Sequence, residues 1–499
     1  MARVPGVAFG VACLTLGGTA SFADVTAQDV WTDSQALYRS MGYELSVKSE
    51  DMSGDTLTVT GIQLTQPLST AEGIEGTTQT SMETLRFIEQ GDGTVRVEVA
   101  APIKGKSSTS LGDGSITEAT NEITLSEDDI VASGAPGDVT YAIDIGKAVV
   151  DTTQTVREDK AEFPTKVTFN LDDISGSYHS TAQSGTAQSG TVTVAEITAK
   201  GSGSDPGGAG FDLDGTMKDL TSNWTMQMPE GMDRQSTFDF YTNKDVNASG
   251  DLSFGATTAN IAVTAEDGDA NIAYSSQSGK VNFGMDNGIL TYGGLTENGE
   301  VKVRLPNLPM PLQASFDKSS GQLTMPIIAG EQAQAFGVQT ELAGLTLSDQ
   351  IWAMFDPTEQ LPRDPADLRV DLSGHAILNQ SLFSDAVMQG GMPSGELKDL
   401  KINALHLDAV GAELNGDGDL RFNSATGMAM PIGTINLALD GAKELMGKLT
   451  EMGLLPQDQA MFAQMILGLY AKPTGDDQLS SQIEFTEDGQ ILANGQRIQ

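Results

Sequence analysis

The sequence predicts a mostly β protein with an elongated antiparallel sheet or sheets, a short N-terminal helix, and a C-terminal helix pair followed by a hairpin. Many short runs alternate apolar and polar residues, and Gly, Asp and Asn separate the runs. Glycine accounts for 56 of the 499 residues, whereas aromatic residues make up only 6%. A period of two buries one face of a strand and wets the other, as in antiparallel sheets.

The first 23 residues predict an export signal. Arg3 supplies a small charged region, an apolar stretch follows, and Ser-Phe-Ala precedes Asp24, which is the small-residue pattern of a cleavage site. We expect cleavage after Ala23 and a periplasmic protein. The single cysteine, Cys13, lies inside this segment, so the cleaved chain has neither a disulfide nor a cysteine nucleophile.

The chain is strongly acidic. It contains 28 Lys and Arg residues against 68 Asp and Glu residues, for a formal net charge of −40. No nucleic-acid partner is expected, because no basic stripe exists to displace counterions from phosphates. A cation-binding surface is one interpretation of this charge, and solubility in a salty medium is the simpler one.

A short helix is predicted over residues 26–41, capped by Thr26 and ended by Gly42. Val30, Trp31 and other apolar residues fall at helical spacings there. The period then changes to two, with strands expected in these runs: 43–49, 55–64, 83–90, 94–100, 191–199, 260–267, 279–285, 288–294 and 300–305.

Glycine- and serine-rich sequence at 199–210 predicts a flexible loop and the best domain boundary. We therefore expect an N-terminal helix plus antiparallel β region over 24–200, a central β region over 212–340, and a C-terminal α+β region over 341–499.

Two helices are predicted near the end of the chain, over 441–453 and 456–472, because apolar residues recur there at helical spacing. Pro456 suits the first turn of the second helix. The final hairpin, over 478–498, is expected to turn at Asp488 and Gly489.

The stretch 348–374 combines a short helix with a proline-stiffened corner. Ser348 is expected to cap the helix, Trp352 to be buried, and Pro357 to end it. From 368 onward Leu and Val alternate on one face of a strand. Arg363 is expected to pair with an acid among Asp356, Glu359, Asp364 and Asp367.

No constellation of catalytic residues is recognisable in the sequence. His179, His375 and His406 stand in separate contexts, without the spacing of metal ligands. Residues 207–215 resemble a single calcium-binding nonapeptide, but Asp214 replaces its buried apolar residue. We therefore expect no catalytic, cofactor-binding or metal-binding residues, no cofactor, and a protein that is not an enzyme.

The segment 348–374, the N-terminal helix with Trp31 and the closing Asp-Gly-Gln-Ile-Leu-Ala-Asn-Gly hairpin together resemble the Domain of Unknown Function 2125 family. This resemblance implies an exported, uncharacterised envelope protein of Gram-negative bacteria with no assigned activity. The C-terminal helix pair and hairpin are also similar to AsmA-like envelope proteins. That second resemblance implies long sheets curled into apolar grooves.

The expected function is that of a non-enzymatic envelope protein that binds lipid or another apolar ligand in a β groove, with lipid or envelope proteins as partners. One alternative is an outer-membrane β-barrel, which suits acidic, cysteine-free, glycine-rich strands. The helices expected over 441–472 have no obvious place in a barrel. A second alternative is a periplasmic hydrolase whose site is assembled only by the tertiary fold.

Overall fold

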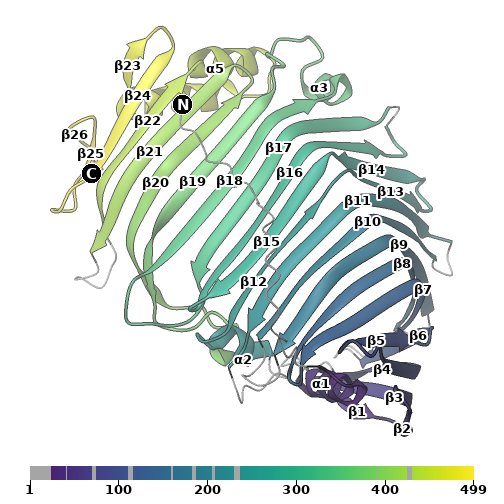
Figure 1. Ribbon diagram of the computed structural model, residues 1–499. Helices are drawn as coiled ribbons and strands as arrows, with labels where there is room; N and C mark the ends of the chain where they lie inside the picture. The colour runs from purple at the N-terminus through teal and green to yellow at the C-terminus, as the bar shows by residue number, and fades with distance from the viewer. Residues whose placement is uncertain are drawn as a thin grey trace, which may run out of the picture.

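The computed structural model describes residues 24–40, 42–69, 75–110, 116–158, 161–181, 187–204, 208–229, 237–308, 310–388, 390–423 and 430–498. The export signal expected at 1–23 lies outside these residues. Within them, one curved antiparallel sheet of 26 strands runs from one end of the molecule to the other (Figure 1). The predicted mostly β fold is therefore confirmed. In the described part of the chain, the first and last strands do not pair with each other.

The N-terminal end of the sheet carries helix α1 (Ala27–Ser40). As predicted, Thr26 caps this helix: its Oγ1 accepts the Asp29 amide at 3.2 Å, and the Asp29 carboxylate accepts the Thr26 amide at 3.0 Å. Gly42 ends it with a φ of 82°. The strands of this end are β1 (Glu44–Ser46), β2 (Ser49–Ser53), β3 (Thr56–Ser69), β4 (Glu75–Glu89), β5 (Val95–Val99) and β6 (Ile103–Ser110).

Long strands follow, and each pairs with the next along the chain. They are β7 (Ile116–Ala135), β8 (Asp138–Glu158), β9 (Ala161–Thr181), β10 (Ala187–Ser204) and β11 (Gly210–Gln227). The boundary expected at 199–210 falls in the hairpin of β10 and β11, which pair along their length from Ala187 with Gln227 to Ser204 with Gly210. The prediction of a flexible loop is thus wrong for residues 199–204, and the sheet is continuous through this point.

Shorter strands and two small helices continue the sheet. They are α2 (Thr237–Thr242), β12 (Asn247–Phe254), β13 (Thr257–Thr264), β14 (Ala270–Ser276), β15 (Ser278–Asp286), β16 (Ile289–Arg304), β17 (Leu312–Pro326), β18 (Gln334–Leu347), α3 (Asp349–Phe355) and β19 (Ala366–Leu378). The helices lie at the ends of the strands, along the edges of the sheet (Figure 1).

The C-terminal part again combines strands with helices, and it ends in the predicted hairpin. Its elements are α4 (Asp385–Met388), β20 (Gly395–Ala409), β21 (Ala412–Asn423), β22 (Met430–Asp440), α5 (Ala442–Glu451), α6 (Gln457–Tyr470), β23 (Lys472–Gly475), β24 (Gln478–Phe485), β25 (Ile491–Ala493) and β26 (Gln496–Arg497). The two predicted helices are confirmed, and Gly489 turns the hairpin with a φ of 76°.

The alternation of faces shifts by one residue inside several long strands. In β7, Glu127 has a left-handed backbone (φ 57°) and lies opposite Gly146 of β8, while the residues on both sides pair normally. Asp173 in β9 and Asp219 in β11 also have a left-handed backbone, and the residues on both sides of each one pair normally. An L-residue enters this region at some cost. Because neighbouring strands shift together, the apolar residues stay on one face of the sheet.

The corner at 348–374 differs from its prediction in two contacts. The Ser348 hydroxyl does not cap α3; it accepts the Gln313 amide of β17 at 3.2 Å. Arg363 does pair with Glu359, at 3.7 Å, but its shorter ion pair joins it to Asp349, at 3.0 Å. Both unforeseen partners are brought close only by the tertiary fold.

Candidate functional site

A continuous row of apolar side chains crosses the sheet from β5 to β25. Each member is the direct cross-strand partner of the next. Because strands lie about 4.8 Å apart, the row is on the order of 75 Å long. This apolar row consists of Val95, Ala132, Tyr141, Tyr178, Gly190, Trp224, Gly250, Phe283, Tyr292, Leu323, Val338, Leu372, Ile402, Gly418, Ile435, Ile483 and Ala493.

The neighbouring position on each strand points to the opposite face of the sheet, and there the row is polar. This polar row consists of Thr140, His179, Ser189, Thr225, Ser249, Gly284, Thr291, Thr324, Gly337, Ser373, Lys401, Asp419, Thr434 and Glu484. The two faces of one sheet therefore differ sharply in chemistry over most of its length.

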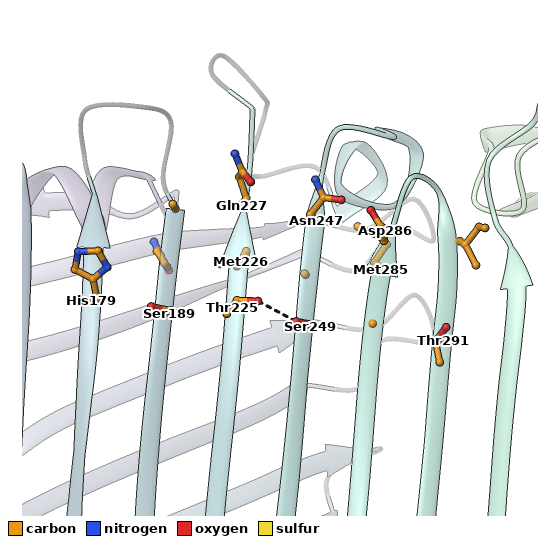
Figure 2. Close-up of a pocket in the computed structure, with 15 residues that line it drawn as sticks. His179, Ser189, Thr225, Met226, Gln227, Asn247, Ser249, Met285, Asp286 and Thr291 are labelled. Carbon is orange, nitrogen blue, oxygen red and sulfur yellow. Dashed lines mark hydrogen bonds between the residues drawn. The ribbon is translucent and has the colours of Figure 1, made fainter. Parts of the chain in front are cut away.

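Figure 2 shows part of the polar row, where His179, Ser189, Thr225, Ser249 and Thr291 lie on neighbouring strands. The hydroxyls of Thr225 and Ser249 hydrogen-bond at 2.9 Å. These side chains help to line a shallow hollow of about 630 Å³. The polar side chains labelled in Figure 2 come from successive strands along the polar row.

Aromatic rings in the apolar row lie close to the sheet. The rings of Tyr141 and Tyr178 stack with centroids 5.9 Å apart, and those of Tyr178 and Trp224 are 5.7 Å apart. Gly190 lies between these two strands, and a Cβ there would come within 2.8 Å of the Trp224 indole nitrogen. Glycine is needed at this position because the indole covers its backbone. Tyr141, Tyr178 and Trp224 thus form a continuous series of rings across β8 to β11.

Burial raises the pKa of Tyr141 to about 12, although its hydroxyl lies 3.5 Å from that of Ser34 in α1. Burial likewise raises the pKa of Tyr178. Both phenols therefore stay uncharged at any physiological pH, so the tyrosines do not introduce charge into the row.

The middle of this apolar face is open to solvent. Tyr292 is 54% exposed and Val338 is 39% exposed, although both lie within the apolar row. Phe169, Ile272 and Leu407, elsewhere on the same face, are also exposed. Contiguous exposed apolar surface of this kind marks binding sites in soluble proteins. We therefore regard the apolar face around the apolar row as the candidate site.

Two places on this face are covered. At the N-terminal end, α1 buries Trp31, and Tyr141 packs against the same core. Farther along, a small core around Val246, Met285 and Ile327 gathers residues from α2 and from the 382–383 segment. Tyr241 and Phe383 stack there with centroids 4.6 Å apart. Tyr292 and Val338, the exposed members of the apolar row, belong to neither core.

The three histidines lie apart, as predicted. His179 pairs with Asp138 at 2.7 Å, His375 with Asp399 at 3.0 Å, and His406 with Asn415 at 2.8 Å. Each bond crosses to a strand that neighbours the histidine's own. Among the described residues, no group of His, Cys, Asp and Glu side chains is suited to hold a metal ion.

Sequence alternation indicated apolar strand faces but not the apolar row itself. The row depends on register, and its openness depends on which segments cover the sheet. Neither property is local in sequence. The usable local signal was the alternation of apolar and polar residues within a strand, as in Trp224-Thr-Met-Gln-Met228.

Comparison with protein-family models, curated proteins and solved structures gave no match. The resemblance to the Domain of Unknown Function 2125 family thus stays a prediction. In the part of the chain that the structure describes, no helix is both long and apolar enough to cross a bilayer.

Proposed function

We propose that this protein is a non-enzymatic periplasmic envelope protein that holds the acyl chains of lipids against its apolar face. The observation that carries this proposal is the open apolar row, with Tyr292 and Val338 exposed in its middle. An apolar face that the chain leaves uncovered gains free energy when a ligand removes it from water. Each buried methylene contributes about 0.8 kcal/mol.

The chemistry of the row favours acyl chains over polar ligands. From Val95 to Ala493 it contains no charged side chain and no hydrogen-bonding group other than the tyrosine hydroxyls and the Trp224 indole. Each leaflet of a bilayer contributes about 15 Å of hydrocarbon thickness, so the row exceeds one acyl chain several-fold. A charged headgroup would stay in water at an edge of the sheet, since the row gives it no partner.

The test compares two faces of the same two strands. Tyr292→Glu with Leu323→Glu places two carboxylates in the apolar row, on β16 and β17. Thr291→Glu with Thr324→Glu places the same charges on the polar row of these strands. Each protein is purified without detergent, extracted with organic solvent and analysed by mass spectrometry.

The expected result is lipid in the wild type and in the Thr291/Thr324 variant, with at least a fivefold loss in the Tyr292/Leu323 variant. Repeated absence of lipid from the wild type would falsify the proposal. Equal lipid content in the two variants would show that the lipid is held elsewhere.

A further inference from the structure

Helix α6 presents a second open apolar surface, separate from the sheet. Within α6, Ala460 is buried, whereas Met461 (61% exposed), Phe462 (60%), Met465 (60%) and Leu469 (57%) project into solvent. Residues 461, 465 and 469 follow one another at i, i+4 spacing and form one stripe, with Phe462 beside it. We call these four residues the α6 stripe. A helix that is apolar on both its packed and its outer side is ordinarily buried.

The α6 stripe has no charged neighbour on its own helix beyond the first turn. Asp458 is the only charged residue of α6. Over the whole segment 441–472, Lys443, Lys448 and Lys472 balance Glu444, Glu451 and Asp458. This local neutrality is unusual in a chain with a net charge of −40. A bilayer with anionic lipids repels acidic surfaces, so a neutral segment such as this one is suited to approach one.

The C-terminal end of α6 lies beside the end of the apolar row. The carbonyl of Tyr470, the last residue of α6, accepts the Ser481 hydroxyl at 2.6 Å and the Asn494 side-chain amide at 2.9 Å. Ser481 and Asn494 are close neighbours of Ile483 and Ala493, the last members of the apolar row. The helix is thereby fixed at the C-terminal end of the sheet.

The helix pair is held firmly enough to act as a docking element. The Asp477 carboxylate accepts the amides of Lys443 and Glu444 at 3.0 and 2.9 Å, which anchors the start of α5. A negative group at a helix N-terminus is favourable. The exposed side chains are therefore presented by an ordered element of the fold.

We propose that the α6 stripe inserts into the surface of a lipid bilayer and docks the C-terminal end of the sheet there. The helix lies along the interface with the α6 stripe in the acyl region. Its phenylalanine and flexible methionines suit a fluid partner that lacks a fixed shape. This docking does not depend on whether the apolar face holds lipid.

The experiment measures flotation of the full chain with phosphatidylcholine vesicles. The test variant is Met461→Gln, Phe462→Gln and Met465→Gln, in which each substitution keeps a good helix former and adds no charge. The matched control is Met310→Gln, Met354→Gln and Met392→Gln, which removes three exposed methionines elsewhere. Far-ultraviolet circular dichroism and unfolding midpoints verify that both variants remain folded.

We expect the wild type and the control variant to float, and the α6 variant to bind vesicles at least tenfold more weakly. Absence of wild-type binding, or equal binding by the α6 variant, overturns the proposal. A dimer of the wild type that the α6 variant loses, without vesicle binding, would identify a second copy as the occupant. The Tyr292/Leu323 variant should still float, so failure of lipid holding and failure of docking remain distinguishable.

Discussion

The same sheet face is a closed core at its N-terminal end and an open surface in its middle. Under α1, Trp31 and Phe87 are fully buried, with ring centroids 5.8 Å apart. Farther along, Tyr292 and Val338 occupy the same face in water. The local sequence of both regions alternates in the same way, so the difference comes from α1 and not from the strands.

This difference separates two uses of apolar residues. Where α1 covers the sheet, burial stabilises the fold. In the middle of the sheet, the same free energy is left available to a ligand. Substitutions at the covered end should therefore lower stability, while substitutions in the middle should leave stability nearly unchanged. The predictions below test this contrast from the largest expected effect to the smallest.

Trp31→Ala should have the largest effect on stability. The side chain is fully buried between α1 and the sheet, so its removal should lower the free energy of unfolding by about 3–5 kcal/mol. Urea denaturation monitored by circular dichroism measures this loss. Gln28→Ala, an exposed position on the same helix, is the control and should change little. A small effect of Trp31→Ala would mean that α1 does not close the core.

Trp352→Ala tests a second buried region, the corner at 348–374 that contains α3 and that we call the α3 corner. Trp352 is 6% exposed, packs on Phe355 at a centroid distance of 5.0 Å, and has the Arg363 guanidinium 5.6 Å above its ring. The expected loss is about 3 kcal/mol, at the lower end for a buried tryptophan. Met354→Ala, at an exposed position of the same helix, is the control. An unchanged urea midpoint for Trp352→Ala would contradict the buried role of this ring.

Asp356 should make the α3 corner sensitive to acid. Burial alone would raise the pKa of its carboxyl, but the amides of Gln360 and Leu361, each donating at 2.9 Å, and the Arg363 charge together hold it below the ordinary value. A carboxyl with a lowered folded-state pKa contributes stability above its unfolded pKa of about 3.9 and loses it as the pH falls through the folded value.

Asp356→Asn should consequently have a lower melting temperature than the wild type at pH 7. The gap in melting temperature between the two proteins should narrow at pH 3. Calorimetry at both values measures this, with Asp364→Asn, at an exposed position nearby, as the control. A gap that stays constant between pH 7 and pH 3 would rule out the ionised carboxylate as the cause.

Thr26→Ala should lower the free energy of unfolding by about 1 kcal/mol, because the Thr26 hydroxyl accepts the Asp29 amide at the start of α1. Its effect on the covered core should be indirect and smaller than that of Trp31→Ala. Thermal unfolding measures it, and Thr26→Ser, which keeps the hydroxyl, should restore most of the stability. If Ser and Ala behave alike, the cap does not support the helix.

Much of the fold was predictable because its signals are local. The α1 cap at Thr26, its stop at Gly42, the C-terminal helices and the turn at Gly489 each depend on a few neighbouring residues. The pairing of Ser348 with Gln313 was not predictable, since 35 residues separate them. The openness of the face at Tyr292 was hidden for the same reason: coverage is a property of the whole fold.

Tyr292→Ala should have the smallest effect on stability, within about 0.5 kcal/mol of the wild type, because more than half of the residue is already exposed. Phe87→Ala, on the covered part of the same face, is the matched comparison and should lower the free energy of unfolding by about 3–5 kcal/mol. Urea denaturation of both variants measures the difference. Similar losses in the two would mean that the middle of the sheet is closed in solution by another segment. A large difference would confirm that this apolar surface is not required for folding, and that its exposure needs a functional explanation.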